Sequence, residues 1–125
     1  MTRERPLEGK RVLILEDDYY LATDEKALLE QAGALVVGPF GGGQDAGELS
    51  KAGHIDAAVV DINMGSGPSF ECAQALADRG VPFVFVTGYD AAIVPSQLAH
   101  VARIEKPIRE RDFLAAVAAL VSEDE

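Results

Sequence analysis

A short apolar run that ends in a carboxylate constrains the fold of this chain more than any other stretch. Residues 57–60 are all apolar, Asp61 follows directly, and the Gly-Ser-Gly segment 65–67 comes soon after. A continuous apolar run closed by turn residues is typical of a strand buried on both faces, as in a parallel sheet. Asp61 would then lie at the carboxyl end of a central strand, where open α/β sheets bind their ligands. Asp also often caps a turn, so this position alone leaves both interpretations open.

Strand-like and helix-like segments alternate five times along the chain. The expected strands are short apolar runs at 11–15, 34–37, 57–61, 81–86 and 101–104. The expected helices lie at about 19–32, at 44–52, from Pro68 onward and at 109–122, and Pro95 keeps the segment 90–100 irregular. This alternation predicts an α/β three-layer sandwich, in which helices cover both faces of a five-stranded parallel sheet. We expect a single domain over residues 1–125, with its core at about 10–122.

Helical spacing indicates which apolar side chains face the sheet. In the first helix these are Leu21, Leu28 and Ala32, in the third Phe70, Ala73 and Ala77, and in the last Phe113, Val117, Leu120 and Val121. Tyr19 and Tyr20 are expected to pack at the start of the first helix, and Cys72 to be a small packing residue. His54 and His100 fall far from the reactive strand ends, and we expect both at the surface.

Composition and charge narrow the classes of partner. The 125 residues contain 11 Lys and Arg against 21 Asp and Glu, a formal net charge of −10. Binding to a nucleic-acid backbone or to an anionic membrane needs clustered cations, so we expect neither. A divalent cation or a basic protein partner suits this charge better. A single cysteine cannot form an internal disulfide, and without a leader-like or membrane-spanning apolar run we expect a cytoplasmic location.

Four of the expected strands end in chemically reactive side chains. The first ends in Glu16 and Asp17, the third in Asp61, the fourth in Thr87 and the fifth in Lys106. The carboxyl ends of parallel strands share one edge of a sheet, so these groups can converge. Two carboxylates 4 Å apart repel by about 4 kcal/mol at an effective dielectric near 20, and such a cluster therefore needs a cation. Carboxylate oxygens with a turn carbonyl suit Mg²⁺.

Phosphoryl transfer to a carboxylate is the chemistry that this set of groups supports. Asp61 would be the nucleophile and would form an acyl phosphate. Mg²⁺ would screen the approaching oxygens, while Lys106 and the Thr87 hydroxyl hold the transferred group. Each strand-ending residue also has a structural interpretation when taken alone. The prediction depends on four strand ends that carry these residue types in this order.

The motifs at these strand ends resemble those of receiver domains of bacterial two-component response regulators, over nearly the full chain. The matching stretches are VLILEDD (12–18), VVDINM (59–64), FVTGYD (85–90) and EKP (105–107). The resemblance implies a flavodoxin-like (βα)5 fold with strand order 2-1-3-4-5, the order of the chemotaxis receiver. It also implies that the whole chain is one receiver domain.

By this resemblance, Asp61 accepts a phosphoryl group from a sensor histidine kinase or a histidine phosphotransferase. Asp17 and Asp61 would bind Mg²⁺ directly with the backbone carbonyl of Asn63, and Glu16 would help through water. Such a domain is a signalling module rather than an enzyme, although it catalyses its own phosphorylation and dephosphorylation. Its output would be the binding of a downstream protein, or the removal of phosphate from a shared kinase.

The resemblance also assigns roles around the phosphoryl group. Thr87 and Lys106 would contact it, and the Lys106-Pro107 bond is expected to be cis. Gly88 and Tyr89 follow Thr87 directly, and we expect them to form a loop that carries the signal to a partner. Gly88 would permit a backbone rearrangement that other residues resist.

Several positions depart from the usual pattern of the family. Arg103 stands where receivers with an aromatic switch have Tyr or Phe, Gly65 where many have Pro, and Ser69 where many have Gly. The FVTGY segment is similar to the Phe-Ala-Thr-Gly-Gly/Tyr signature of a receiver subgroup, often stand-alone, that lacks the aromatic switch and is tied to general stress signalling. Val86 replaces the Ala of that signature. We expect Arg103 to be exposed, because a buried guanidinium without a partner is unfavourable.

Two other classes of function stay open. A haloacid-dehalogenase-like phosphatase also forms an aspartyl phosphate, but its nucleophile belongs to an Asp-x-Asp pair on the first strand. Strand one here ends in Glu-Asp-Asp at 16–18, and no cap domain is available to enclose a substrate. A degenerate, non-phosphorylated binding module is the other alternative, although all five site residues are present.

Overall fold

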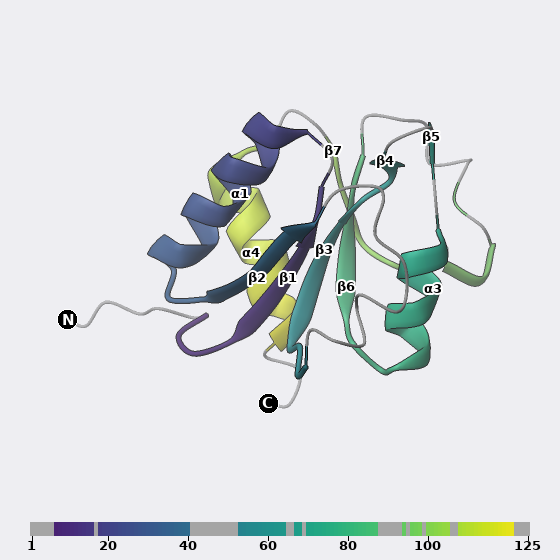
Figure 1. Cartoon of the computed structure of the whole chain (residues 1–125), viewed down its shortest axis with the longest axis horizontal. Helices are drawn as coiled ribbons and strands as arrows, with labels where there is room; N and C mark the ends of the chain where they lie inside the picture. The colour runs from purple at the N-terminus through teal and green to yellow at the C-terminus, as the bar shows by residue number, and fades with distance from the viewer. Residues whose placement is uncertain are drawn as a thin grey trace.

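Five strands form one parallel sheet at the centre of the computed structural model (Figure 1), which describes residues 7–16, 18–40, 53–64, 67–68, 70–87, 94, 96–98, 100–105 and 108–121. The strands are β1 (Arg11–Leu15), β2 (Leu35–Phe40), β3 (Ala57–Asp61), β6 (Phe83–Thr87) and β7 (Arg103–Glu105). Their order across the sheet is β2-β1-β3-β6-β7, and every neighbouring pair is parallel. In chain order this is 2-1-3-4-5, which confirms the predicted fold class.

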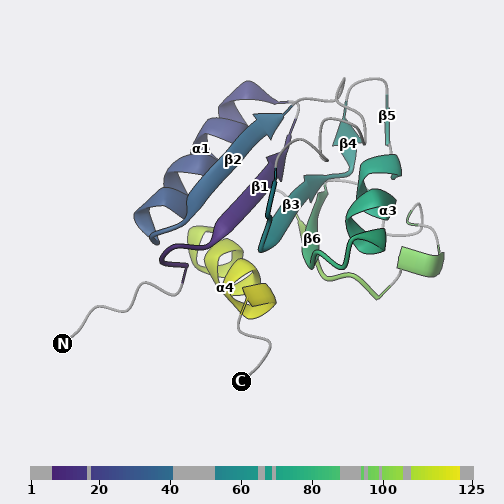
Figure 2. The same cartoon turned by 60° about the horizontal axis from the view of Figure 1, so that its bottom comes forward.

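Helices cover both faces of the sheet and make it the middle of three layers (Figure 2). α1 (Tyr19–Gln31) and α4 (Glu110–Val121) lie on one face, and α3 (Glu71–Asp78) lies on the other. A short antiparallel pair, β4 (Asn63–Met64) with β5 (Gly67–Pro68), follows β3, and a 3-10 turn, η2 (Ser96–Leu98), precedes β7. Within the described ranges, no helix has the length and apolar character needed to cross a bilayer.

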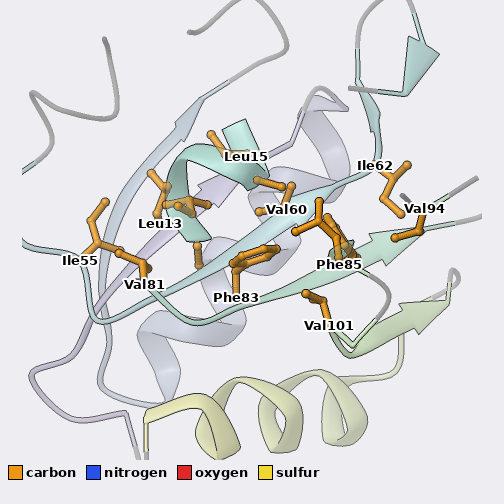
Figure 3. Close-up of a cluster of buried hydrophobic side chains, with 14 residues drawn as sticks. Leu13, Leu15, Ile55, Val60, Ile62, Val81, Phe83, Phe85, Val94 and Val101 are labelled. Atoms are coloured by element: carbon orange, nitrogen blue, oxygen red, sulfur yellow. The ribbon is translucent and has the colours of Figure 1, made fainter. Parts of the chain in front are cut away.

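Side chains of the central strands alternate between two cores, because neighbouring residues of a strand point to opposite faces. The core on the α3 side includes Leu13, Leu15, Ala58, Val60, Phe83 and Phe85 (Figure 3). The core on the α1 and α4 side includes Val12, Ile14, Val59, Val84 and Val86. Complete burial of each Val, Leu, Ile or Phe side chain stabilises the fold by roughly 1.5–3 kcal/mol. The central strands are therefore buried on both faces, as their continuous apolar runs predict.

The second strand is longer than predicted. It does not stop at Val37 but continues through the cis Gly38-Pro39 bond to Phe40. Gly38 adopts a φ of 100°, a conformation that glycine reaches without steric strain. The Phe40 carbonyl oxygen then accepts a hydrogen bond of 2.9 Å from the backbone N–H of Glu16. The Gly-Pro pair is a local irregularity in β2 and not its end.

The boundaries of the third helix and the fifth strand also differ from the prediction. The third helix does not begin near Pro68, because that residue pairs with Asn63 in the short β4–β5 sheet. α3 starts at Glu71 instead. The fifth strand, β7, begins at Arg103 rather than at Val101. The helix predicted at 44–52 lies outside the described residues, as does the side chain of Cys72.

α1 turns a different face to the sheet from the one predicted. Its buried residues are Ala22, Glu25 and Leu29. The predicted set, Leu21, Leu28 and Ala32, is half-buried, and Leu28 and Ala32 still pack against the core. The buried stripe is thus rotated by about one residue, and the rotation brings a carboxyl group into the interior.

Two further packing predictions were wrong. Tyr19 and Tyr20 do not pack into the fold: they are 73% and 79% exposed and contact each other edge to face, with ring centroids 5.4 Å apart. In α3, Ala77 is exposed and Leu76 is buried beside Ala73. The inward positions of this helix therefore follow its start at residue 71 rather than at residue 68.

Hydrogen bonds anchor the segment that leads into β3, at the edge of the sheet opposite Asp61. The Asp56 carboxylate accepts a hydrogen bond of 2.9 Å from the backbone N–H of Arg11, and its other oxygen lies 2.8 Å from His54 Nε2. The Arg11 Nε donates to the His54 carbonyl oxygen at 2.6 Å, and Arg79 donates to the carbonyl oxygen of residue 53 at 3.1 Å. The Arg11 N–H and the neighbouring His54 hold the pKa of Asp56 below its usual range.

Asp56→Asn should lower the free energy of unfolding by about 1 kcal/mol at pH 7, because it removes the charge that strengthens two hydrogen bonds. A depressed pKa contributes stability above the unfolded value of 3.8 that disappears as the pH falls through the folded value. Urea unfolding at several pH values should therefore show the two proteins converging in acid. A difference of the same size at pH 7 and in strong acid would contradict the role of charge.

Candidate functional site

Three of the predicted side chains meet at the carboxyl edge of the sheet. β1 pairs with β3 so that Leu15 lies opposite Val60, and the next residues along, Glu16 and Asp61, are therefore neighbours across the two strands. β6 pairs with the other side of β3, and Thr87 lies one residue beyond the partner of Asp61. Glu16, Asp61 and Thr87 are only 3%, 1% and 2% exposed. The strand register makes Glu16 and Asp61 neighbours and places the buried Thr87 at the end of the next strand.

Strand alternation fixes the side of the sheet on which the two carboxyl groups lie. Val12 and Ile14 of β1 and Val59 of β3 belong to the core under α1 and α4. Glu16 and Asp61 continue the same alternation, so they are directed to that side as well. The acid pair therefore lies where the sheet edge meets the beginning of α1.

The start of α1 holds one oxygen of Glu16. Asp18 is the N-cap of the helix, and its Oδ1 accepts a hydrogen bond of 3.0 Å from the N–H of Leu21. The N–H of Asp18 donates in turn to Glu16 Oε2 at 3.1 Å. The second oxygen, Glu16 Oε1, is buried and has no hydrogen-bond partner among the described residues. This oxygen is therefore available to a ligand that is not part of the polypeptide.

Burial is the main cause of a large upward shift in the pKa of Glu16, which rises from 4.5 to about 9. A hydrogen bond with the Asp61 carboxyl and the charge of Asp61 add to the shift, the Asp18 N–H opposes it, and the charge of Glu25 adds a little more. A hydrogen bond between two carboxyl groups requires that one of them holds a proton. Burial and the neighbouring Asp61 carboxyl therefore favour the protonated form of Glu16 in the metal-free protein.

A divalent cation fits this arrangement, because it would satisfy Glu16 Oε1 and replace the proton. The predicted Mg²⁺ ligands are only partly visible: Glu16 and Asp61 lie together, the backbone of Asn63 follows in β4, and Asp17 lies outside the described residues. Among the residues that the structure describes, no group of three His, Cys, Asp or Glu side chains is placed to hold a metal ion. The full ligand set stays a prediction.

Of the remaining predicted site residues, the structure describes only some. Lys106, Pro107, Gly88 and Tyr89 lie outside the described residues, so the predicted cis bond and signalling loop stay predictions. Arg103 is exposed at the start of β7, as expected.

The two histidines lie away from the acid pair. His54 is on the segment that leads into β3, at the opposite end of that strand, and its side chain is 73% exposed. His100 is exposed as well. Their predicted surface positions are confirmed.

Glu25 is the buried group near this site that the sequence analysis missed. Its position, three residues after Ala22 and four before Leu29, is an inward position of a helix. The helical spacing of Ala22, Glu25 and Leu29 predicts this inward position, provided that charged residues are also considered for the inward face.

Comparison with known proteins places the chain among signalling domains. Residues 12–118 match the family described as response regulator receiver domain. The chain is 28% identical over 117 residues to the transcriptional regulatory protein PdtaR of Mycobacterium tuberculosis (strain H37Rv). That similarity covers 90% of this chain and 57% of PdtaR, so the chain spans a little over half of the relative's length.

Solved structures with the same fold cover almost the whole chain. A response regulator receiver protein from Sinorhizobium medicae WSM419 is similar with a TM-score of 0.78 and 26% identity, over 95% of this chain and 99% of that one. SdrG from Pseudomonas melonis Fr1, solved in solution in its BeF3-activated conformation, is similar with a TM-score of 0.73 and 33% identity, over 97% and 99%.

The raised pKa of Glu16 predicts how stability changes with pH in the absence of metal. Between pH 4.5 and about 9 the folded protein holds a proton that the unfolded chain has lost, so stability should fall as the pH rises. The slope from this one group reaches at most about 1.4 kcal/mol per pH unit. Urea unfolding in a chelating buffer from pH 5 to pH 8 should show the decline.

Glu16→Gln cannot ionise and should flatten this dependence. Glu30→Gln, at an exposed position of α1, serves as the matched control and should keep the wild-type slope. An unchanged slope in Glu16→Gln would mean that another group causes the pH dependence.

Proposed function

Because the chain belongs to the response regulator receiver domain family, we propose that it receives a phosphoryl group on Asp61 from a sensor histidine kinase or a histidine phosphotransferase. The observation that carries this proposal is the burial of Asp61 beside Glu16 at the carboxyl edge of β3. A carboxylate in this position is fixed by the central strand and is adjacent to both neighbouring strand ends. The family is one of signalling domains, and its match over residues 12–118 favours this function over a hydrolase.

In the proposed reaction, a carboxylate oxygen of Asp61 attacks the phosphorus of a phosphohistidine. The new O–P bond forms as the P–N bond breaks, and the departing imidazole nitrogen keeps the electron pair of that bond and takes up a proton. The products are an acyl phosphate on Asp61 and a neutral histidine on the donor. The domain would also catalyse hydrolysis of its own acyl phosphate.

The ligands for Mg²⁺ would be Asp17, Asp61 and the backbone carbonyl of Asn63, with Glu16 acting through water. When bound, the ion supplies positive charge that offsets the repulsion between the carboxylates and the phosphoryl oxygens. Two observations support a cation here: the buried Glu16 Oε1 has no hydrogen-bond partner among the described residues, and the pKa of Glu16 is raised to about 9.

The transferred group would be held by Thr87 and Lys106. Support for Thr87 comes from its burial and from its place at the end of β6, the strand beside β3. Phosphorylation adds negative charge and acceptor oxygens at this point, which would draw the Thr87 hydroxyl toward them. The signal would then leave through Gly88 and Tyr89. Receivers with an aromatic switch have a ring at position 103, which fills the space that Thr leaves when it moves, but here this residue is an exposed Arg.

The output would be the binding of a downstream protein or the removal of phosphate from a shared kinase. A net charge of −10 supports a partner with a basic surface and argues against nucleic acid. The FVTGY segment supports a role in general stress signalling. A cytoplasmic location stays a prediction from the sequence.

Asp61→Asn should abolish the gain of about one phosphoryl group per chain that intact mass spectrometry detects after incubation with acetyl phosphate and Mg²⁺, because an amide oxygen is a much poorer nucleophile. Asp56→Asn is the matched control: it makes the same change just before the start of the same strand, and it should label as the wild type does. Stoichiometric labelling of Asp61→Asn would show that another residue is the acceptor.

The route of the signal predicts different effects for two substitutions. Backbone amide shifts, recorded with and without beryllofluoride, should change over residues 87–100 in the wild type. Gly88→Ala should reduce these changes by about half or more, because a Cβ restricts the backbone. Arg103→Ala should leave them largely intact, since the side chain is already exposed. The opposite pattern would identify Arg103 as the switch.

A further inference from the structure

A groove lies at the amino edge of the sheet, where the end of α4 meets the beginnings of two strands. The groove has a volume of about 480 Å³. It is lined by Leu120 and Val121 at the end of α4, and by Lys10 and Asp56, the residues directly before β1 and β3. The last turn of α4 is therefore close to the start of the strand that ends in Asp61 (Figure 1).

Lys10 brings to this groove a positive charge that has no ion-pair partner in the described part of the chain. Asp56 lines the groove too, but its oxygens are already engaged, one by the Arg11 N–H at 2.9 Å and the other by His54 Nε2 at 2.8 Å. The side chains of Arg11 and Arg79 each donate to a backbone carbonyl oxygen of the segment that leads into β3. Basic side chains thus gather at this edge of a protein whose formal net charge is −10.

The sequence places three carboxylates directly after α4. The helix ends at Val121, and Ser-Glu-Asp-Glu follows at 122–125, outside the described residues. The C-terminal end of a helix carries partial negative charge, and α4 has no basic residue in its last turn. Acidic residues at this point are repelled by the helix dipole, so a cation beside them stabilises them. Two extended residues span about 7 Å, which brings Glu123 and Asp124 within reach of other residues that line the groove.

We propose that this groove is the binding site of the chain's own acidic segment 122–125, and that Lys10 is the cation that recognises it. A carboxylate of the segment forms an ion pair with Lys10 Nζ, and the segment then joins the end of α4 to the residues that begin β1 and β3. The inference does not depend on the proposed function, because it involves neither a phosphoryl group nor a metal and concerns the edge of the sheet opposite Asp61.

Proximity favours this occupant over an acidic segment of another protein. The segment is attached to Val121, which itself lines the groove. A short connection of this kind gives an effective concentration on the order of millimolar, without any further contact. A separate acidic protein would also be repelled by the net charge of −10.

A double-mutant cycle, measured by urea unfolding, tests the pairing. One variant is Lys10→Gln, the second carries Glu123→Gln, Asp124→Asn and Glu125→Gln, and the third combines all four changes. At low ionic strength the effects should be non-additive, with a coupling of roughly twofold to fivefold in the unfolding equilibrium constant, the range typical of exposed ion pairs. In 1 M NaCl, where the Debye length is about 3 Å, the coupling should disappear.

Lys26→Gln is the matched control, because it removes a lysine charge from α1, where Glu30 is the partner. This change should show no coupling with the segment. Backbone amide shifts give a second readout: Lys10→Gln should shift the amides of 122–125, and the triple substitution in the segment should shift the amide of His54.

Two results would overturn the inference in its simplest form. Additive effects of Lys10→Gln and the triple substitution at low salt would show that Lys10 does not pair with the segment. Coupling of the same size with Lys26→Gln would reduce the effect to one of net charge. Coupling that grows with protein concentration would also contradict it, since the segment of a second copy would then occupy the groove.

Discussion

Two carboxyl groups side by side, in a place that water hardly reaches, are the constraint on which this site depends. Glu16 and Asp61 are neighbours because β1 and β3 are parallel and in register, and both are almost completely buried. Burial disfavours their charged forms, and their proximity disfavours the double charge further. The pair can share a proton or a cation. In the proposed function, this pair binds a divalent ion and Asp61 accepts a phosphoryl group.

The rest of the fold keeps this unfavourable pair in place. The central strands are buried on both faces, so the acid pair is held by two cores and not by a loop. At the far end of β3, Asp56 joins Arg11 and His54 in a set of hydrogen bonds that anchors the approach to the strand. At the near end, the Asp18 cap begins α1 and fixes one oxygen of Glu16. Glu25, on the inward face of that helix, is a further buried carboxyl group.

The strands and the residues that end them were easier to predict from the sequence than the helices. A strand buried on both faces appears as a continuous apolar run, and the residue that follows the run lies at the sheet edge whatever the loops do. This is why Asp61 and Thr87 were placed correctly by sequence alone. The Gly-Pro pair in β2 and Pro68 misled the prediction, because their local preferences favour a strand end and a helix start. Pairing with neighbouring strands overrode both preferences.

The face of α1 could not be predicted from apolar spacing, because the helix has leucines on two adjacent rows. The spacing of Leu21 and Leu28 is as helical as the spacing that the structure buries, and the buried set contains a charged residue. A pattern that counts only apolar residues therefore rejects the correct face. Apolar spacing therefore failed where the interior holds Glu25.

A crystal structure with beryllofluoride and with Mn²⁺ in place of Mg²⁺ would test whether Asp61 accepts the phosphoryl group beside a cation, because anomalous scattering locates the metal without reference to the protein geometry. We expect beryllium bonded to a carboxylate oxygen of Asp61, with the metal peak beside it and within reach of Glu16. Beryllofluoride on a different carboxylate, or a metal peak remote from Glu16 and Asp61, would contradict it.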